Sequence, residues 1–399
     1  MRGLPELDVD PFDAATSTDP GEMYDRLLAD PVCWLSRYGV VGISSYDLAK
    51  EVLSNPLAFR SSNGVGLSNI DDVRRWRQPS LLIESDPPDH RRARAVVNRV
   101  LSRDRVSRLK TAIESRAASA IDVMRSHESI EAMDTVIFPF VAENLRSSLG
   151  LRHLEMHDLK TWGRLVFDGF GPAETAKGLP VRQMDAVRDS VAKATDPGNL
   201  LADGLAMQIF EAGSEVGYST VESGLLVRAF VSGGYLTVAA AIGSAIQGLA
   251  GDGRQLDELR RRPELALAAL DEAIRVETPI RVFFRTTAGG QILGGRAIPS
   301  GTKVAVFLGA ANRDPLRWDR PATFDIARRY RRSLSFGHGV HGCVGQYFAR
   351  LQGLTLIGAL ARAQVSWSPS GRPTYLRNNS LRCLERLPLS ISVAQRSGH

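Results

Sequence analysis

The chain has 399 residues, 43% of them hydrophobic, and acidic and basic residues are mixed along its length. This composition predicts a globular protein with a large buried core and argues against a disordered chain. The formal net charge of +6 is modest for this length, and no basic stripe alternates with aromatic residues. These features argue against nucleic-acid binding and favour an acidic protein partner instead.

Three cysteines, Cys33, Cys343 and Cys383, lie far apart and form no C-x-x-C pair. They predict a reducing compartment without disulfides or a zinc site. The first residues lack the apolar segment of a signal peptide or membrane anchor, so we expect a cytoplasmic protein that does not insert into membranes. No linker or repeat divides the chain, which predicts a single domain over residues 1–399, and we expect a monomer.

Most of the chain has the periodicity of helices. In residues 102–124, apolar residues recur at spacings of three and four, which predicts an amphipathic helix. Ser219 and Glu222 form a potential capping box before an uncharged run from Ala229 to Gly251, which predicts a helix from about residue 220 to about 250. The run is long enough to cross a bilayer, but its Gly, Ser and Gln content favours a core helix of a helical protein.

The pattern changes after residue 278. The segment RVFFRTTAGGQILGGRAIPSGTKVAVFLG contains short β-rich runs separated by glycine and proline turns, which predicts two or three strands linked by hairpins. Helical periodicity returns after Cys343. The predicted fold class is therefore mainly α with a small β region.

Residues 334–353, LSFGHGVHGCVGQYFARLQG, place Phe336, Cys343 and Gly345 among further glycines, directly before a predicted helix. Glycines let the backbone approach a flat cofactor, and a following helix N-terminus favours a thiolate. The segment therefore predicts a cysteine ligand for iron. The alternative is a buried structural cysteine beside a glycine turn, which this spacing disfavours.

The arrangement F-x-x-G-x-H-x-C-x-G resembles that of the cytochrome P450 haem-thiolate enzymes. Glu272 and Arg275, three residues apart, are similar to a helix pair of this family. Residues 312–329 resemble its meander region, with fitting residues Asn312, Arg313, Asp314, Pro315, Pro321, Phe324 and Arg328. The resemblance implies the cytochrome P450 fold, with a long central helix over a buried haem, and an oxidoreductase or monooxygenase activity.

The resemblance also implies the cofactor and its contacts. Haem b would have Cys343 as its axial iron ligand, with Phe336 and Gly345 beside it. The family's D-P-P-x-H-x-x-x-R motif is similar to residues 86–94 and implies that the haem propionates bind to His90, Arg94, Arg285 and His341. Arginine guanidinium groups suit carboxylates because they can form two parallel hydrogen bonds.

The central helix of the family carries a small residue, a glycine, a variable residue, an acid and a threonine. The corresponding residues here are Gly233, Gly234, Tyr235, Leu236 and Thr237. The resemblance implies that the two glycines give room for oxygen and that Thr237 supplies a catalytic hydroxyl. Leu236 stands in the place of the acid and cannot relay protons, so oxygen insertion should be slower unless a neighbouring group compensates.

The chain is most similar to soluble bacterial members that oxidise para-substituted benzoates, in the segments SSNGVGLSNI, PSLLIESDPPDH, LVFDGFGP and FFRTTAGGQILGG. Residues predicted to form the substrate pocket are Asn63, Phe167, Phe170, Ser232, Leu236, Ile280 and Phe283. Asn63 and Ala229 stand where those members have an arginine and a serine, although Arg228 and Ser232 remain. The two differences argue against a small benzoate as the substrate.

We therefore expect an oxidase that acts on an aromatic group in bacterial biosynthesis, and oxidative cross-linking of aromatic side chains in a short peptide is one form of that activity. The alternative is a conventional monooxygenase that hydroxylates or O-demethylates a small aromatic compound. A peroxide-driven enzyme and a haem-binding sensor or carrier are further alternatives.

The chain has no glycine motif for a flavin or a nicotinamide. Electrons are therefore expected from a separate acidic iron–sulfur protein of the ferredoxin type. Four arginines that precede the cysteine segment are the hypothetical docking site for this donor: Arg328, Arg329, Arg331 and Arg332.

Overall fold

The computed structural model describes residues 3–74, 77–172 and 180–393. Helices dominate this part of the chain, which confirms the predicted class. The α-helices are α1 (Ala14–Thr18), α2 (Gly21–Ala29), α3 (Tyr46–Ser54), α4 (Ile70–Arg74), α5 (Asp89–Val100), α6 (Arg103–Ser107), α7 (Lys110–Arg125), α8 (Phe138–Leu149), α9 (Met156–Asp168), α10 (Val181–Ala194), α11 (Leu205–Glu215), α12 (Thr220–Gly233), α13 (Leu236–Gly251), α14 (Gly253–Arg261), α15 (Ala266–Glu277), α16 (Leu308–Ala311) and α17 (Gln346–Arg362).

Strands are short and form small sheets. They are β1 (Val32–Leu35), β2 (Val40–Ile43), β3 (Phe59–Arg60), β4 (Ser129–Glu131), β5 (Val282–Thr287), β6 (Gln291–Leu293), β7 (Arg296–Ile298), β8 (Lys303–Phe307), β9 (Val365–Pro369), β10 (Thr374–Tyr375), β11 (Leu384–Arg386) and β12 (Pro388–Val393). The largest sheet has the order β1-β2-β8-β5-β3, and the others pair β4-β12-β9, β10-β11 and β6-β7.

The predicted strands after residue 278 are present, but the sheet is larger than the sequence indicated. Strands β6 and β7 pair as a hairpin, whereas β8 pairs with β5 across that hairpin and also with β2, in parallel, with Val41 opposite Val304. Strands of the N-terminal segment thus complete a sheet with strands from residues more than 200 positions later. No local pattern reveals such a pairing, because the partners are far apart in the sequence.

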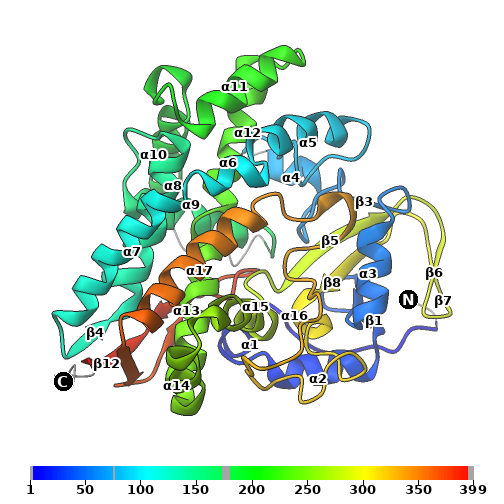
Figure 1. Cartoon of the computed structure of the whole chain (residues 1–399). Helices are drawn as coiled ribbons and strands as arrows, with labels where there is room; N and C mark the ends of the chain where they lie inside the picture. The colour runs from blue at the N-terminus through cyan, green and yellow to red at the C-terminus, as the bar shows by residue number, and fades with distance from the viewer. Residues whose placement is uncertain (1–2, 75–76, 173–179, 394–399) are drawn as a thin grey trace, which may run out of the picture.

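The predicted central helix begins where the sequence indicated. Ser219 and Glu222 form the complete capping box. The helix is interrupted at Gly234 and Tyr235, so it continues as a second segment, α13, after a local distortion. The combined stretch is long and apolar enough to cross a membrane, and 56% of its most apolar window is buried in the protein. It runs through the middle of the molecule, behind α17 in Figure 1, as a core helix does.

The predicted helix over residues 102–124 is also divided. The structure has the short helix α6 and then α7, with Arg108 and Leu109 between them. The apolar face is buried as predicted, including Val106, Ile113 and Met124. Helix α7 packs against α17, and α17 in turn packs against α13 and α15. This packing fixes the helix that follows Cys343 relative to the central helix.

Candidate active site

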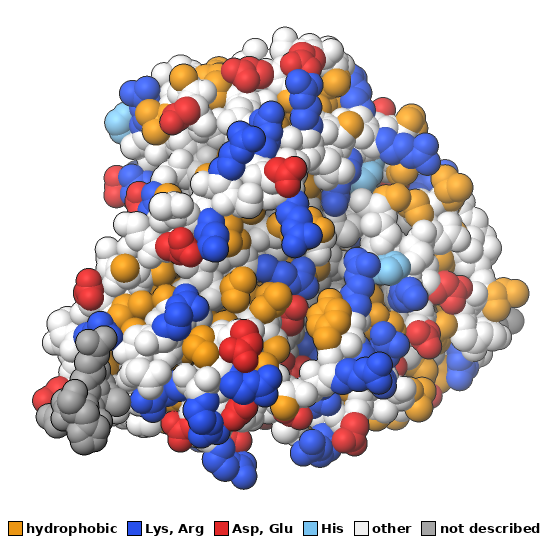
Figure 2. All heavy atoms as spheres, viewed as in Figure 1, with side chains coloured by type: hydrophobic (Ala, Val, Ile, Leu, Met, Phe, Trp, Pro, Cys, Tyr) orange, Lys and Arg blue, Asp and Glu red, His pale blue; other side chains and the backbone are white. Residues whose placement is uncertain are grey.

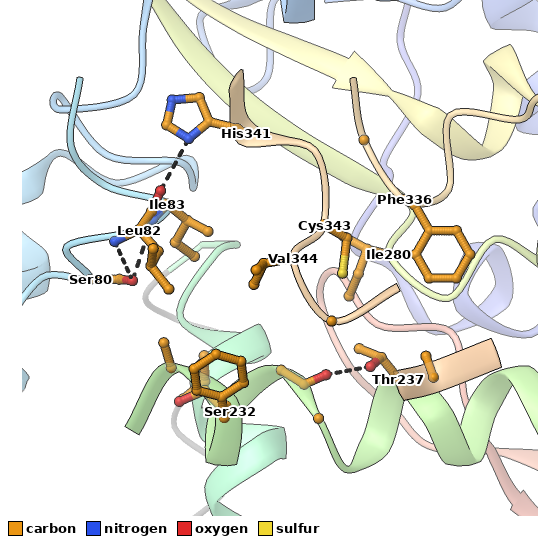
Figure 3. A pocket seen from close by; sticks show the side chains of 18 of the residues that line it. Ser80, Leu82, Ile83, Ser232, Thr237, Ile280, Phe336, His341, Cys343 and Val344 are labelled. Carbon is orange, nitrogen blue, oxygen red and sulfur yellow. Dashed lines mark hydrogen bonds between the residues drawn. The ribbon is translucent and has the colours of Figure 1, made fainter. Parts of the chain in front are cut away.

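A cavity of about 300 Å³ lies between the cysteine segment and the central helix. Figure 3 shows Cys343 on the segment before α17 and Thr237 on α13, on opposite sides of this space. Most of its wall is apolar. The sequence predicted that these two segments face each other, and the structure brings them together at the same cavity.

Cys343 is held in a tight loop directly before α17. Its backbone N–H donates to the Phe336 carbonyl at 2.7 Å. Gly339 has a φ of 65°, and a Cβ atom there would lie 2.4 Å from the Leu53 carbonyl oxygen, so only glycine fits. Burial raises the pKa of the Cys343 thiol, while the nearby N–H groups of Gly345 and the charge of Arg94 lower it. A bound cation at the sulfur would favour the thiolate further.

A buried ionic network supports this loop from behind. Glu272 accepts hydrogen bonds from Arg275 at 2.7 and 2.8 Å and from Arg328 at 2.8 Å. Arg275 also donates to the carbonyls of Asn312 and Pro321. The Glu272 and Arg275 side chains are 6% and 3% exposed, so this pair belongs to the core rather than the surface.

Asn312 connects the network to the cysteine segment. Its side chain accepts from the Leu334 N–H at 2.7 Å and donates to the hydroxyls of Thr278 and Ser335. The meander region predicted from the sequence therefore holds the start of the loop that carries Cys343. The sequence identified these residues only by resemblance, and the structure shows that they hold the loop in place.

Basic groups gather at one end of the cavity. Arg94, Arg285 and His341 line the wall, whereas His90 lies directly behind it, with its ring 4.3 Å from that of His341. Burial, Arg285 and His90 together lower the pKa of His341 to about 3, so its ring is neutral. Burial lowers the pKa of Arg285 to about 10, which keeps its guanidinium charged near neutral pH.

His341 and His90 differ in their free hydrogen-bonding capacity. His341 contacts the Leu82 carbonyl through Nδ1 and the Ser61 hydroxyl through Nε2, so both ring nitrogens are occupied. Both ring nitrogens of His90 are buried and lack a partner in the described part of the chain. The free imidazole donor is therefore on His90, and the predicted propionate contact of His341 would require it to exchange a partner.

The central-helix residues with a predicted catalytic role lie where the prediction requires. Gly233, Gly234 and Thr237 all line the cavity. A Cβ atom on Gly233 would meet no atom within 4 Å, so the space beside it is open. The Thr237 hydroxyl donates to the Gly233 carbonyl, which leaves its oxygen able to accept a hydrogen bond from the cavity.

Leu236 does not line the cavity, in contrast to its prediction as a pocket residue. It is fully buried against α9, where a Cβ atom on Gly163 would lie 2.8 Å from its Cδ1. Side chains of successive helical residues point about 100° apart. Thr237 faces the cavity, so Leu236 faces the neighbouring helix α9. The position that carries an acid in the family is therefore an apolar contact between α9 and α13.

The three phenylalanines that the sequence predicts for the substrate pocket lie close together. Phe167, Phe170 and Phe283 line the cavity, and successive ring centroids in this group lie 5.8 and 5.7 Å apart. Ile280, Ser232 and Phe336 also contribute to the wall. Asn63 does not: it is exposed, and its carbonyl accepts a hydrogen bond from Lys303. The prediction of Asn63 as a pocket residue is thus wrong, because the loop that carries it turns its backbone toward β8.

Two cavity residues were missed in the sequence. Arg77 and Ser80 line the wall together with Arg228, which the sequence noted only as a retained residue. Arg77 pairs with Glu84 at 2.7 and 2.8 Å, and both side chains are nearly inaccessible. Arg228 forms no ion pair with any residue in the described ranges, and burial and the charge of Arg77 lower its pKa. Arg77 stands in an arginine-rich segment, and nothing in its spacing distinguishes it from a surface charge.

Comparisons with known proteins agree with this site. Residues 205–379 match the family model for cytochrome P450. The chain is 37% identical to cytochrome P450 CYP199A2 of Rhodopseudomonas palustris over 395 residues, which cover 98% of this chain and 96% of that protein. This chain belongs to the cytochrome P450 family. It is also 30% identical to cytochrome P450 107B1 of Saccharopolyspora erythraea over 95% of this chain and 96% of that protein.

The fold agrees with solved structures of the family. The crystal structure of CalO2 superposes with a TM-score of 0.82 at 28% sequence identity and covers 97% of this P450 and all of that chain. The protein is therefore a cytochrome P450 monooxygenase with bacterial relatives. The relatives favour the simpler monooxygenase alternative and give no support to the expected peptide cross-linking.

Family membership implies a haem-thiolate cofactor, and the residues of this P450 fit it. The half-buried Cys343, glycine backbone at Gly337 and Gly339, and a buried histidine without partners in the described part of the chain lie at one end of the cavity. Buried imidazole nitrogens without partners are costly unless a ligand satisfies them. Cys343 would hold the haem iron, and Arg94, Arg285 and His90 would hold the two haem propionates.

Proposed function

We propose that this P450 inserts oxygen into a small aromatic compound that carries a carboxylate. The observation that carries the proposal is the pair of arginines, Arg77 and Arg228, in a cavity wall otherwise formed mainly by aliphatic and aromatic side chains. Glu84 already neutralises Arg77, and Arg94 and Arg285 lie where the haem propionates are expected, so the positive charge left for a substrate belongs to Arg228. A buried cation without a counter-ion is unfavourable, and an anionic ligand would relieve that cost.

This proposal revises the expectation that a small benzoate is a poor substrate. That expectation rested on Asn63 and Ala229. Asn63 lies outside the cavity, so its identity has no direct effect on a ligand. Ala229 lines the cavity, but the neighbouring Arg228 supplies a stronger anion contact than the serine would, because a hydrogen bond from a charged donor is worth roughly twice a neutral one.

Some cavity residues would bind the substrate, and others would take part in the chemistry. The rings of Phe167, Phe170 and Phe283 supply an apolar surface for an aromatic ring. Arg228 would hold the carboxylate and so orient the opposite end of the ring. When bound, the haem supplies the electron-transfer and oxygen chemistry. The Thr237 hydroxyl can accept and donate a proton at the open space beside Gly233.

The experiment compares two ligands of similar shape, 4-methoxybenzoate and the uncharged 4-methoxytoluene. We expect the haem-loaded protein to bind the benzoate with a substrate-type spectral shift and to release formaldehyde and 4-hydroxybenzoate when supplied with dioxygen and electrons. Product mass separates oxygen insertion from coupling, since coupled products lose two hydrogens. Equal affinity for the two ligands, or a coupled product, would refute the proposal.

Variants of the arginine sharpen this test. Arg228→Met should weaken 4-methoxybenzoate binding about ten- to a hundredfold, the range expected for one hydrogen bond to a charged group, and should leave 4-methoxytoluene binding unchanged or improved. Arg254→Met is the matched control, because this arginine is 92% exposed on α14.

We further propose that the chain is a single cytoplasmic P450 domain that takes electrons from an acidic iron–sulfur protein. Figure 2 views the molecule from the side of α17 and shows many Lys and Arg side chains on this face. A hollow beside the cysteine segment is lined by Arg329, Arg331 and Arg332, all exposed, together with the exposed rings of Tyr330 and Tyr347. Arg328 differs, because it is half-buried and pairs with the buried Glu272.

Charge reversal tests the docking face. Arg329→Glu combined with Arg332→Glu should slow electron transfer from an acidic ferredoxin and weaken its salt dependence, because electrostatic steering acts through such charges. Unchanged rates and salt dependence in this double variant would remove these arginines from the interface. Arg328 should not be changed in this test, since its loss would disturb the fold.

A further inference from the structure

A loop over residues 61–68 folds around the ammonium group of Lys303, at the beginning of β8. The Nζ atom donates hydrogen bonds to the carbonyls of Asn63, Gly64 and Ser68 at 3.1, 3.3 and 3.3 Å. An ammonium has three donors and no acceptor, so these three carbonyls use its full capacity. Lys303 forms no ion pair with a carboxylate in the ranges that the structure describes.

The same loop forms part of the cavity wall. Val65 lines the cavity and is 1% exposed, and its carbonyl accepts from the Phe284 N–H of β5 at 3.0 Å. Gly66 lies against Phe170, where a Cβ atom would be 2.7 Å from the Phe170 Cα. The Leu67 N–H donates to the Phe170 carbonyl at 2.8 Å. The loop therefore positions both Val65 and one of the three pocket phenylalanines.

We propose that Lys303 is a positioning residue, whose ammonium serves as a fixed structural cation that shapes the substrate wall formed by Val65 and Phe170. The proposal rests on the proposed function only for the identity of the substrate. It predicts that Lys303 controls how well an aromatic group fits the cavity without contacting that group itself, since Lys303 does not line the cavity.

The cation is needed because three carbonyl oxygens converge on one point. Without a donor there, their lone pairs would face one another and the loop would have to open to find water. Burial lowers the pKa of Lys303 to about 8, and the charges of Glu84 and Asp72 raise it, so the ammonium form prevails at neutral pH. The order that Lys303 gives to the loop therefore offsets the cost of burying its charge.

The first experiment replaces Lys303 with methionine, which has a similar length but no donors. We expect Lys303→Met to increase amide hydrogen exchange in residues 61–68, including Gly64 and Leu67, while exchange elsewhere stays at the wild-type level. Lys193→Met is the matched control, because Lys193 is exposed on α10. Equal exchange of the loop in Lys303→Met and the wild type would overturn the proposal.

The second experiment measures the cavity with two haem ligands. We expect Lys303→Met to weaken binding of 4-phenylimidazole about tenfold, because part of the binding free energy is then used to order the loop. Binding of imidazole should not change. Because both ligands bind the iron, their ratio reports only the wall that contacts the phenyl ring. Parallel losses for both ligands would contradict a positioning role.

Chemical rescue separates the ammonium from general packing. Lys303→Ala should show the same loose loop, and added methylammonium should restore 4-phenylimidazole binding, whereas tetramethylammonium, which has no N–H donor, should not. Restoration by both ions, or by neither, would refute the proposal. These readouts do not use a carboxylate ligand, so failure of 4-methoxybenzoate to bind would refute the proposed substrate class and leave this test intact.

Discussion

The ion network behind the cysteine loop and the central-helix wall of the cavity differ in whether their charged groups have partners of opposite charge. Behind the cysteine loop, the buried Glu272 and Arg275 pair with each other and with the half-buried Arg328, and this network is complete without any ligand. On the central-helix side, the wall is mostly apolar, and Arg228 has no acidic partner in the described part of the chain. The difference indicates that the Glu272 network is a closed frame behind the cysteine loop, whereas the central-helix wall keeps an unsatisfied charge for a substrate. A change in the frame should therefore affect stability, and a change in the opposite wall should affect ligand use.

The largest expected effect comes from breaking the frame. Glu272→Gln leaves the buried Arg275 and the half-buried Arg328 without a counter-charge, and breaking a buried pair in this way costs about 3–5 kcal/mol. We expect a lower free energy of unfolding in denaturant titrations and loss of haem at lower denaturant concentration. Ligand preference in the folded fraction should not change.

A surface pair provides the control for this variant. Glu258 on α14 pairs with Arg261 and with Arg262, which directly follows the helix, and water solvates all three groups. Glu258→Gln should change the unfolding midpoint very little, because exposed ion pairs contribute little to stability. If both variants lost the same stability, burial of the Glu272 network would not be the reason for its effect.

The sequence predicted the two sides with unequal success, for a physical reason. Cys343, Phe336 and Gly345 lie in one short segment, so their relative positions follow from local backbone geometry. The opposite wall is assembled from loops around residues 65 and 77, helix α9 at residue 167 and strand β5 at residue 283, and nothing local links them. The pairing of Arg77 with Glu84 and the outward turn of Asn63 depend on that assembly and could not be predicted from spacing.

A moderate effect is expected where α9 meets the central helix. Leu236 packs against Gly163, and its truncation in Leu236→Ala should cost about 2–5 kcal/mol as a buried cavity forms. The gap lies one residue from Thr237, so we also expect water to enter and more reducing equivalents to be lost as hydrogen peroxide. Consumption of the electron donor compared with product formation measures this loss.

Leu249→Ala is the matched control for this prediction. Leu249 is fully buried on the same helix but does not line the cavity. It should lose similar stability without a change in the yield of product per electron. Equal uncoupling in both variants would assign the effect to general loosening of α13.

Leu236→Asp addresses the missing acid separately. If the acid of the family acts as a proton relay, restoring it should alter the yield of product per electron relative to Leu236→Asn, which has a similar size and no charge. The same yield in both variants would show that the leucine is a neutral replacement at this position.

The smallest expected effect concerns Asp168, at the end of α9. Its carboxylate accepts from the Asn379 N–H at 3.1 Å. Burial raises the pKa of Asp168 to about 6, although the hydrogen bond from Asn379 and the charge of Arg164 lower it. Because the folded-state pKa is higher than the unfolded one, the stabilisation from protonated Asp168 is complete below the unfolded pKa of about 4 and is lost as the pH rises through about 6.

Asp168→Asn should therefore remove this pH dependence, since the amide keeps the acceptor and never ionises. The wild type should lose about 1 kcal/mol relative to the variant between about pH 5 and about pH 7 in denaturant titrations. Parallel pH profiles for the two proteins would contradict the raised pKa. Asp168 directly follows Phe167 and lies outside the Glu272 network. The substitution should therefore leave the Glu272 network unaffected. The pH dependence of stability at the substrate wall can then be measured separately from that at the haem site.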